Sequence, residues 1–249
     1  MLTPDPDYGS GVFRRRLRLN VATREVHVAL EDGNHAFRLA LRHDGERITA
    51  IEPAYVRHPF TTCPGSAGFL TALVGRPLDD RPEDRRLPER RHSCTHVTDM
   101  ARLALDHVRD AGLRRLYDIE VDDECDGRSS TRISRDGQLV HEWIISRQVI
   151  VGPEELADRP MMQGFHAWVR QAFTGLALEA AIALQRGWFV AQTRRYRMTP
   201  VHEHPAIGDG MPEGVCYSYS TPAVQRAERI EGSKRDFTHR ADALLRFDR

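Results

Sequence analysis

The sequence lacks an excess of charge of either sign and has almost no lysine. Its 249 residues include 36 basic and 36 acidic side chains, so the formal net charge is zero, and Lys234 is the only lysine. The preference for arginine is typical of a GC-rich genome. A chain without a net field has no general attraction to nucleic acid or to a membrane surface. We therefore expect neither nucleic acid nor a membrane as a partner.

No long apolar run and no signal-peptide pattern is visible in the sequence. The most apolar stretch, residues 163–189, is interrupted by Arg170, Glu179 and Arg186, which is typical of a core helix rather than a membrane span. The first residues contain no apolar segment of the signal-peptide kind. The four cysteines are too few for a disulfide scaffold in a chain of this length. These absences predict a cytoplasmic protein whose thiols are free to bind metal.

The common nucleotide and hydrolase motifs do not occur. The sequence has no phosphate-binding loop, dinucleotide fingerprint, nucleophile elbow or H-E-x-x-H motif. This excludes most nucleotide-binding, α/β-hydrolase and zincin classes. Arg14, Arg15 and Arg16 lie where arginine alternates with leucine, and we interpret them as the solvated face of a strand rather than as a nucleic-acid site.

Hydrophobic patterning predicts an α+β protein with an antiparallel sheet and helices packed on one face. Apolar and polar residues alternate over residues 16–19, 26–30 and 37–42, with Asp-Gly turns at residues 32–33 and 44–45. Helical spacing follows over 69–74 and 95–108, strands return over 116–149, and 165–184 predict one long helix. We expect residues 1–112 to form a core that carries the site. Residues 113–249 should add a β-hairpin extension, the long helix and a C-terminal wrap, all within one compact unit.

Two cysteines and a histidine carry the main chemical signal. Cys63 and Cys94 each lie at the predicted start of a helix, where backbone N–H groups and the helix dipole favour a thiolate. With His96, they supply most of a tetrahedral nitrogen and sulfur site for one divalent metal ion, zinc or iron. The alternatives are that both cysteines are small buried hydrophobic residues and that His96 is a polar residue of the first helical turn.

Two further histidines are candidates for the same site. His35 follows the first predicted hairpin turn, and it is either a fourth ligand or a solvent-facing turn residue. His92 competes with His96, because residues on the two sides of Cys94 do not easily both point inward. The choice between them depends on geometry that the sequence does not give.

Asp99, His107 and Glu179 are the candidate catalytic residues. Asp99 follows His96 by one helical turn and either orients its imidazole or stabilises the positive helix start. His107 lies on the same helical stripe as His96, and it either approaches the metal or packs half-buried against the sheet. Glu179 flanks an apolar helix face; partly buried, it would have a raised pKa and serve as a general acid or base, whereas at an exposed edge it would not.

Four sequence segments carry a resemblance to a known fold: G-E-R-I-T-A-I, T-T-C-P-G-S-A-G-F-L-T-A-L, L-V-G-R-P-L-D-D and H-S-C-T-H-V-T-D-M-A-R-L-A-L. In order and spacing, residues 36–108 resemble the N-terminal domain of IscU/NifU-like iron–sulfur scaffold proteins. C-P-G-S followed by C-T-H-V-T-D more closely resembles an uncharacterised bacterial family without a firmly assigned activity. The scaffold's first cysteine has no counterpart in D-G-N-H, and its His-Cys pair is split by Ser93. A single-ion site from His35, Cys63, Cys94 and His96 fits these departures.

These observations predict a metal-dependent enzyme. An ion with one open position would polarise a substrate oxygen or activate water. We expect a lyase that cleaves carbon–carbon bonds in a retro-aldol manner, or a hydrolase, with a small organic and possibly aromatic catabolite as substrate. An iron–sulfur cluster or metal-delivery scaffold and a structural zinc module are the alternatives. A homodimer and the role of the chain after Met198 are left open.

Overall fold

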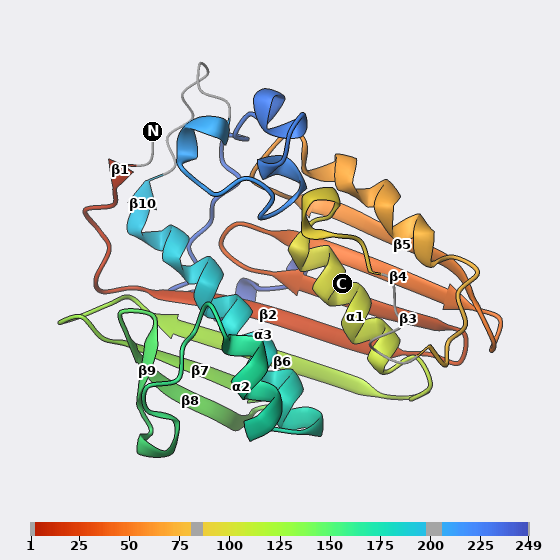
Figure 1. Cartoon of the computed structure of the whole chain (residues 1–249), viewed down its shortest axis with the longest axis horizontal. Helices are drawn as coiled ribbons and strands as arrows, with labels where there is room; N and C mark the ends of the chain where they lie inside the picture. The colour runs from red at the N-terminus through yellow and green to blue at the C-terminus, as the bar shows by residue number, and fades with distance from the viewer. Residues whose placement is uncertain (1–2, 81–86, 198–205, 249) are drawn as a thin grey trace.

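An eight-stranded antiparallel sheet forms the centre of the protein (Figure 1). The computed structural model describes residues 3–80, 87–197 and 206–248. The strand order is β5-β4-β3-β2-β6-β7-β8-β9. The strands are β2 (Val12–Val21), β3 (Glu25–Glu31), β4 (Ala36–His43), β5 (Ile48–Arg57), β6 (Arg114–Asp122), β7 (Ser129–Arg135), β8 (Gln138–Ser146) and β9 (Val149–Gly152). The antiparallel sheet predicted from the alternating pattern is therefore confirmed.

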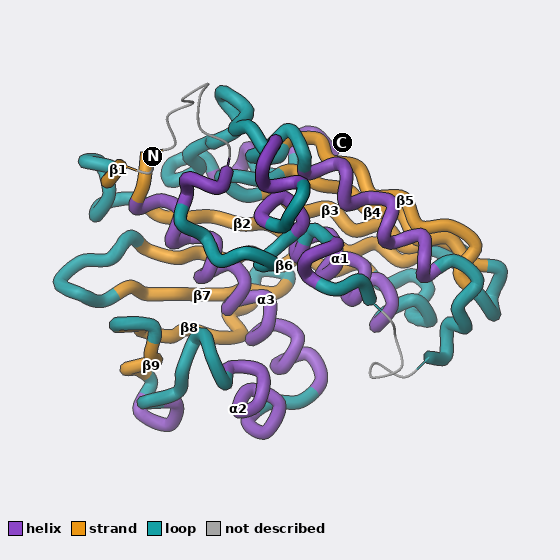
Figure 2. The backbone as a smooth tube through the Cα atoms, turned by 45° about the horizontal axis from the view of Figure 1, so that its top comes forward, coloured by secondary structure: helices purple, strands orange, loops and turns teal. Residues whose placement is uncertain are grey.

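The chain contains the same arrangement two times, namely four strands followed by two helices. Strands β2 to β5 are followed by η1 (Cys63–Leu73) and α1 (Thr95–Asp106), and strands β6 to β9 by α2 (Phe165–Ala172) and α3 (Gly175–Ala191). α1 packs on β3 and β4, whereas α3 packs on β6, β7 and β8, so both lie on the same face of the sheet (Figure 2). The pairing of β2 with β6 joins the segments 1–112 and 113–249, with Leu17 opposite Tyr117.

The helices differ in detail from the predicted ones. The single helix expected over 165–184 is broken between α2 and α3, where Phe173 and Thr174 are extended and Gly175 has a φ of 52°. The helix expected after Cys63 is a 3₁₀ run, because Pro64 and two glycines lower its α-helical propensity. In the part of the chain that the structure describes, no helix is both long and apolar enough to cross a membrane.

Two apolar clusters fill the space between sheet and helices. One lies under α1 and includes Leu39 and Met100; the other lies under α2 and α3 and includes Trp143 and Phe165. Leu17 of β2 packs against both clusters. The boundary between them therefore runs along the central strands, and polar side chains are buried there.

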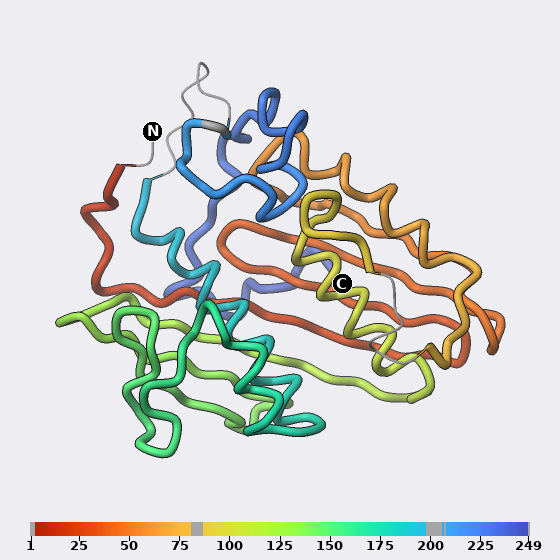
Figure 3. Tube along the Cα trace, viewed as in Figure 1, coloured from red at the N-terminus to blue at the C-terminus, as the bar shows by residue number. Residues whose placement is uncertain are grey.

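The end of the chain covers the opposite face of the sheet. Outward-facing arginines of β2 pair with carboxylates there: Arg14 with Glu120, Arg16 with Asp118 and Arg18 with Asp248. The backbone N–H of Leu245 donates to Glu31 Oε2 at 2.6 Å, and that of Arg235 donates to the Gly33 carbonyl at 2.7 Å. Figure 3 shows this last segment, in blue, passing behind the N-terminal strands. The β3–β4 hairpin turn is buried by this cover.

Short elements complete the described chain. β1 (Thr3–Pro4) pairs with β10 (Tyr196–Arg197) in a small separate sheet. The 3₁₀ turns are η2 (Arg90–His92), η3 (Glu154–Leu156), η4 (Gln192–Arg195), η5 (Ala206–Asp209), η6 (Tyr217–Tyr219), η7 (Ala223–Arg226), η8 (Ala241–Ala243) and η9 (Arg246–Asp248). η6 lies against both η1 and η2, so the chain after Met198 returns to the region of Cys63 and Cys94.

Candidate functional site

Two histidines are in contact where the start of α1 lies over the β3–β4 hairpin. His35 immediately precedes β4, and His96 lies in the first turn of α1. Their ring centroids are 4.1 Å apart in an edge-to-face arrangement. His96 is 7% exposed, and the side chain of His35 is 12% exposed. The structure thus brings together two of the residues predicted as metal ligands.

Asp32 holds His35 from within the β3–β4 turn. Its Oδ1 atom accepts the backbone N–H of Asn34 at 2.7 Å and that of His35 at 2.9 Å, and it lies 3.1 Å from His35 Nδ1. Its Oδ2 atom accepts hydrogen bonds from Arg15 Nε at 2.9 Å and from Arg15 Nη2 at 2.5 Å. Asp32 and Arg15 are both buried. A fully hydrogen-bonded ion pair of this kind keeps a buried carboxylate charged.

The electrostatics of this cluster keep both imidazoles neutral near pH 7. Burial opposes ionisation of Asp32, but His35 and Arg15 hold its pKa well below the usual 3.8. Burial, together with Arg15 and Arg57, lowers the pKa of His35 although Asp32 raises it. Burial, His35 and Arg15 together hold the pKa of His96 well below 6.5. Since ionised Asp32 only accepts hydrogen bonds, His35 carries its proton on Nδ1, and its Nε2 lone pair is available.

His96 has a buried ring nitrogen without a partner. Its Nδ1 atom makes no hydrogen bond with any residue that the structure describes. A buried polar atom left in this state costs free energy, on the order of 1–3 kcal/mol. An unpartnered buried polar atom in a folded protein needs an explanation. One explanation is a ligand that completes its hydrogen bonding. This nitrogen marks a place where a polar ligand would be stabilised.

Three cysteines come together near the histidine pair. Cys63 is the first residue of η1, Cys94 is the N-cap of α1, and Cys216 immediately precedes η6. Ser218 Oγ donates to Cys63 Sγ at 3.4 Å. The backbone N–H of Tyr217, which follows Cys216, donates to the carbonyl of Ser93, which precedes Cys94, at 3.0 Å. The last of these three cysteines comes from the part of the chain for which the sequence predicted only a wrap.

Aromatic side chains link the cysteines to the histidines. The hydroxyl groups of Tyr55 and Ser66 are 2.6 Å apart, and Ser66 Oγ donates to the Cys63 carbonyl at 2.9 Å. The ring centroid of Phe37 lies 5.1 Å from that of Tyr55 and 5.3 Å from that of His35. Burial raises the pKa of Tyr55, and negative charge on the three cysteines would raise it further. The thiols and the imidazoles are therefore neighbouring groups.

The expectation that the helix starts favour thiolates is wrong. Burial raises the pKa of Cys63 to about 11. Burial and the nearby Cys63 raise the pKa of Cys94 above its usual 9.0, and burial also raises that of Cys216. Both Cys63 and Cys94 do lie at helix starts, as predicted. The loss of hydration in the interior outweighs the helix-end field, so the three thiols are protonated near neutral pH.

The predicted metal ligands do not surround one point. Among residues 3–80, 87–197 and 206–248, no three His, Cys, Asp or Glu side chains are placed to hold one metal ion. The sequence left the choice between His92 and His96 open. His92 is exposed and stacks on Phe69, with ring centroids 5.1 Å apart, so it is His96 that faces the interior. As they stand, His35 and His96 form one group and the thiols another.

Asp99 pairs with arginines rather than with an imidazole. Its Oδ2 atom accepts a hydrogen bond from Arg186 Nε at 2.6 Å, and its Oδ1 atom one from Arg102 Nη1 at 3.1 Å. Arg186 belongs to α3, so this carboxylate links α1 to α3. A role in orienting His96 has no support in these contacts.

His107 and Glu179 meet each other at the far end of α1. His107 Nε2 lies 2.7 Å from Glu179 Oε2, and Glu179 also accepts hydrogen bonds from Arg115 and Tyr117. Although burial opposes it, the bonds from His107 and Tyr117 lower the pKa of Glu179, whereas a role as general acid or base at neutral pH would need a raised value. His107 lies about 16 Å from His96 along α1, at roughly 1.5 Å per residue. These two residues form a separate polar cluster between the two halves.

Sequence reasoning missed Arg15, Asp32 and Cys216. Arg15 was grouped with exposed arginines, but strand alternation places it on the same face as Phe13 and Leu17, which are core residues. The alternation of side chains along this strand could therefore have identified Arg15 as a buried residue from the sequence. Asp32 had the sequence of an exposed turn, and it is buried because the distant C-terminus covers the hairpin. No local pattern marks Cys216.

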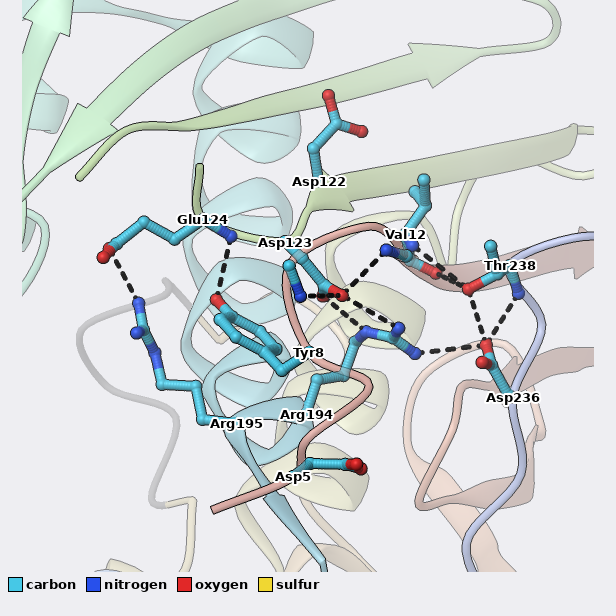
Figure 4. A network of polar contacts seen from close by, with 12 residues as sticks. Asp5, Tyr8, Val12, Asp122, Asp123, Glu124, Arg194, Arg195, Asp236 and Thr238 are labelled. Carbon is cyan, nitrogen blue, oxygen red and sulfur yellow. Dashed lines mark hydrogen bonds and ion pairs between the residues drawn. The ribbon is translucent and has the colours of Figure 1, made fainter. Parts of the chain in front are cut away.

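A separate cavity of about 410 Å³ opens where β6 and β8 end, beside the C-terminal end of α3. On its wall, the Tyr8 hydroxyl accepts the backbone N–H of Glu124 at 3.0 Å, and Arg195 Nη2 donates to Glu124 Oε2 at 2.8 Å (Figure 4). Buried Asp123 accepts Arg194 Nε at 2.7 Å and the backbone N–H of Gly11 at 2.9 Å. These bonds fix the loop before β2 against the end of β6.

No protein-family model, curated protein or solved structure matches the chain.

Proposed function

We propose that the protein is an enzyme, a lyase or a hydrolase acting on a small organic molecule, with His35 as its general base. The observation that carries the proposal is the Asp32–His35–His96 arrangement. It combines an ionised buried carboxylate, a neutral imidazole oriented by it and a second neutral imidazole with an unpartnered nitrogen. A carboxylate that fixes the tautomer of a histidine is a recurring support for general-base catalysis.

Retro-aldol cleavage and hydrolysis both begin at such a base. In retro-aldol cleavage the base removes a proton from a substrate hydroxyl group, and in hydrolysis it removes a proton from water. His35 Nε2 has the free lone pair for this step, because Asp32 accepts the hydrogen bond from Nδ1. The negative charge of Asp32 stabilises the imidazolium that results. Arg15 keeps Asp32 ionised, and His96 offers a hydrogen bond to a substrate oxygen.

Metal binding is the second candidate, and the gathering of Cys63, Cys94 and Cys216 favours it. A carboxylate such as Asp32 behind His35 is also typical of metal-bound imidazoles, and protonated thiols lose their protons when a metal binds. This reading includes a zinc or iron enzyme and a metal-delivery scaffold of the IscU/NifU kind. It requires side chains to move, because no three ligands within the described ranges are in place for one ion.

Turnover assays on matched variants test the proposal. The substrates are 4-hydroxy-2-oxo acids for retro-aldol cleavage and p-nitrophenyl esters for hydrolysis. His35→Gln is compared with His27→Gln, whose histidine side chain is 54% exposed on β3. We expect His35→Gln to lower kcat by about 100-fold or more and His27→Gln to leave it unchanged. Equal activity in both variants would rule out His35 as the base.

A chelator separates the two candidates. Activity that survives exhaustive treatment with EDTA supports catalysis by the histidine pair alone. A stoichiometric zinc or iron ion in the natively purified protein that is lost in Cys94→Ser, together with activity lost on chelation, supports the metal enzyme instead.

A further inference from the structure

The cavity at the end of α3 has an apolar floor. Val121 and Ile145 line it from the sheet, and Trp188 and Ala191 line it from α3. Its volume of about 410 Å³ lies in the range of small-molecule sites, which combine apolar walls with a few polar groups. None of the residues of the proposed catalytic centre lines this cavity. An apolar ligand body would be desolvated against this floor.

The acidic residues around the cavity already have cationic partners. Each of the three consecutive carboxylates that line it is bound by an arginine: Asp122 by Arg132 at 2.9 Å, Asp123 by Arg194 at 2.7 Å and Glu124 by Arg195 at 2.8 Å. Two of these pairs are drawn in Figure 4. The negative charges are therefore neutralised locally and give a cationic ligand little net attraction.

Arg147 is the charged lining residue without a partner. It lies in the tight turn between β8 and β9 and is exposed, and within the described part of the chain its guanidinium forms no hydrogen bond or ion pair. The Tyr8 hydroxyl accepts the Glu124 N–H, so its own proton remains available. The free polar groups at the cavity thus include a cation, Arg147, and a hydrogen-bond donor, the Tyr8 hydroxyl.

We propose that this cavity binds a small aromatic carboxylate. The aromatic ring lies on the apolar floor beside Trp188, where Tyr8 and Tyr196 supply further aromatic wall. The carboxylate pairs with Arg147, whose planar guanidinium matches carboxylate geometry with two parallel hydrogen bonds. This site goes beyond the proposed activity, since it rests on other residues and does not depend on His35 being a base.

Titration of the ¹⁵N-labelled protein by NMR tests the assignment. The probes are benzoate and phenylacetate, with benzylamine and benzyl alcohol as cationic and neutral counterparts. We expect the two carboxylates to shift the backbone signals of residues lining the cavity and to bind more tightly than the other two compounds. Tighter binding of benzylamine would overturn the proposal. So would the absence of any shift from either carboxylate at a ligand concentration of about 10 mM.

Four variants complete the test. Arg147→Gln should weaken phenylacetate binding roughly 10-fold or more, since it removes a charge-assisted hydrogen bond. Arg159→Gln, at an exposed arginine that does not line the cavity, should leave binding unchanged. Ala191→Leu narrows the cavity and should block binding. Thermal unfolding should show that this variant is folded. Equal affinity in the two arginine variants, or full affinity in folded Ala191→Leu, would contradict the site. His35→Gln should bind phenylacetate normally, so this test is independent of the enzyme assay.

Discussion

The imidazole of His35 stands edge-on to that of His96 with 4.1 Å between the ring centroids, although one residue precedes a strand and the other belongs to the helix packed over it. A positive charge on either ring would lie in a buried environment and face a neighbouring imidazole. Burial lowers both pKa values, and the charge of His35 lowers that of His96 further. Asp32 offsets part of this cost for both rings, but its hydrogen bond is with His35, whose tautomer it fixes.

Removing the charge of Asp32 should destabilise the fold. Asp32→Asn leaves the buried guanidinium of Arg15 without its anionic partner, and we expect a loss of about 3–5 kcal/mol in the free energy of unfolding. Urea denaturation followed by circular dichroism measures this. The double variant Arg15→Met/Asp32→Asn removes both charges and should recover much of the loss. A loss below about 1 kcal/mol in Asp32→Asn would show that the pair is not a buried charge pair.

The His107–Glu179 contact should make stability depend on pH in a defined window. The hydrogen bond to Glu179 raises the pKa of His107 above its usual 6.5, so its stabilisation is complete below pH 6.5 and is lost as the pH rises through the raised value. The pKa of Glu179 is lowered from its usual 4.5, so its stabilisation is present above pH 4.5 and is lost as the pH falls through the lowered value. The pair contributes most between these limits.

Denaturation of His107→Gln across the pH range checks this expectation. The variant should lose about 1–3 kcal/mol near pH 5.5 and distinctly less at pH 8.5. His239→Gln, in a histidine outside this cluster, serves as the control and should follow the wild-type profile. A loss in His107→Gln that is the same at both pH values would mean that the histidine is not charged in the folded protein.

The cysteines should differ sharply in reactivity. Cys125 is exposed, whereas burial raises the pKa values of Cys63, Cys94 and Cys216. Because the thiolate is the reactive form, a disulfide reagent such as DTNB should label one thiol quickly at pH 8 and the other three only slowly. Cys125→Ser should remove the fast phase. A fast phase that remains in this variant would show that a buried cysteine is more accessible than the structure indicates.

Gly187 should not tolerate a side chain. A Cβ atom there would lie 2.6 Å from Ile119 Cγ2, so α3 and β6 are in close contact at this glycine. Glycine to alanine in a helix ordinarily stabilises by about 1 kcal/mol, but here we expect a loss of about 1–3 kcal/mol from overpacking. Thermal unfolding of Gly187→Ala measures the effect, and adding Ile119→Val should restore part of the stability. A rise in stability in the single variant would contradict the close packing.

Local sequence patterns were sufficient for most of the sheet. The alternation at residues 26–30 and 37–42 and the turn at 31–34 predicted β3, β4 and their hairpin, because each strand buries one face. The break at Thr174–Gly175 was not foreseen, since the apolar stripe continues across it. The end of α2 is visible in the backbone, where Phe173 and Thr174 are extended and Gly175 has a positive φ. A continuous hydrophobic pattern does not distinguish one helix from two helices that pack in sequence.

The candidate site was only partly predictable for a different reason. Cys63, Cys94, His96 and His35 were all singled out, and the last two are in contact. Their division into two groups depends on the lateral positions of η1 and α1, which no local pattern encodes. The burial of Asp32 depends on contacts of Gly33 and Glu31 with the far end of the chain. Burial is a tertiary property, and it reverses the expected charge state of the thiols.

The claim that His35 is a neutral base held by Asp32 is tested most directly by long-range ¹H–¹⁵N NMR of the histidine side chains as a function of pH. The structure predicts that at pH 7 His35 is neutral with its proton on Nδ1, that His96 is also neutral, and that His96 titrates well below pH 6.5. Titration of both His35 and His96 near pH 6.5, or a His35 proton on Nε2, would contradict it.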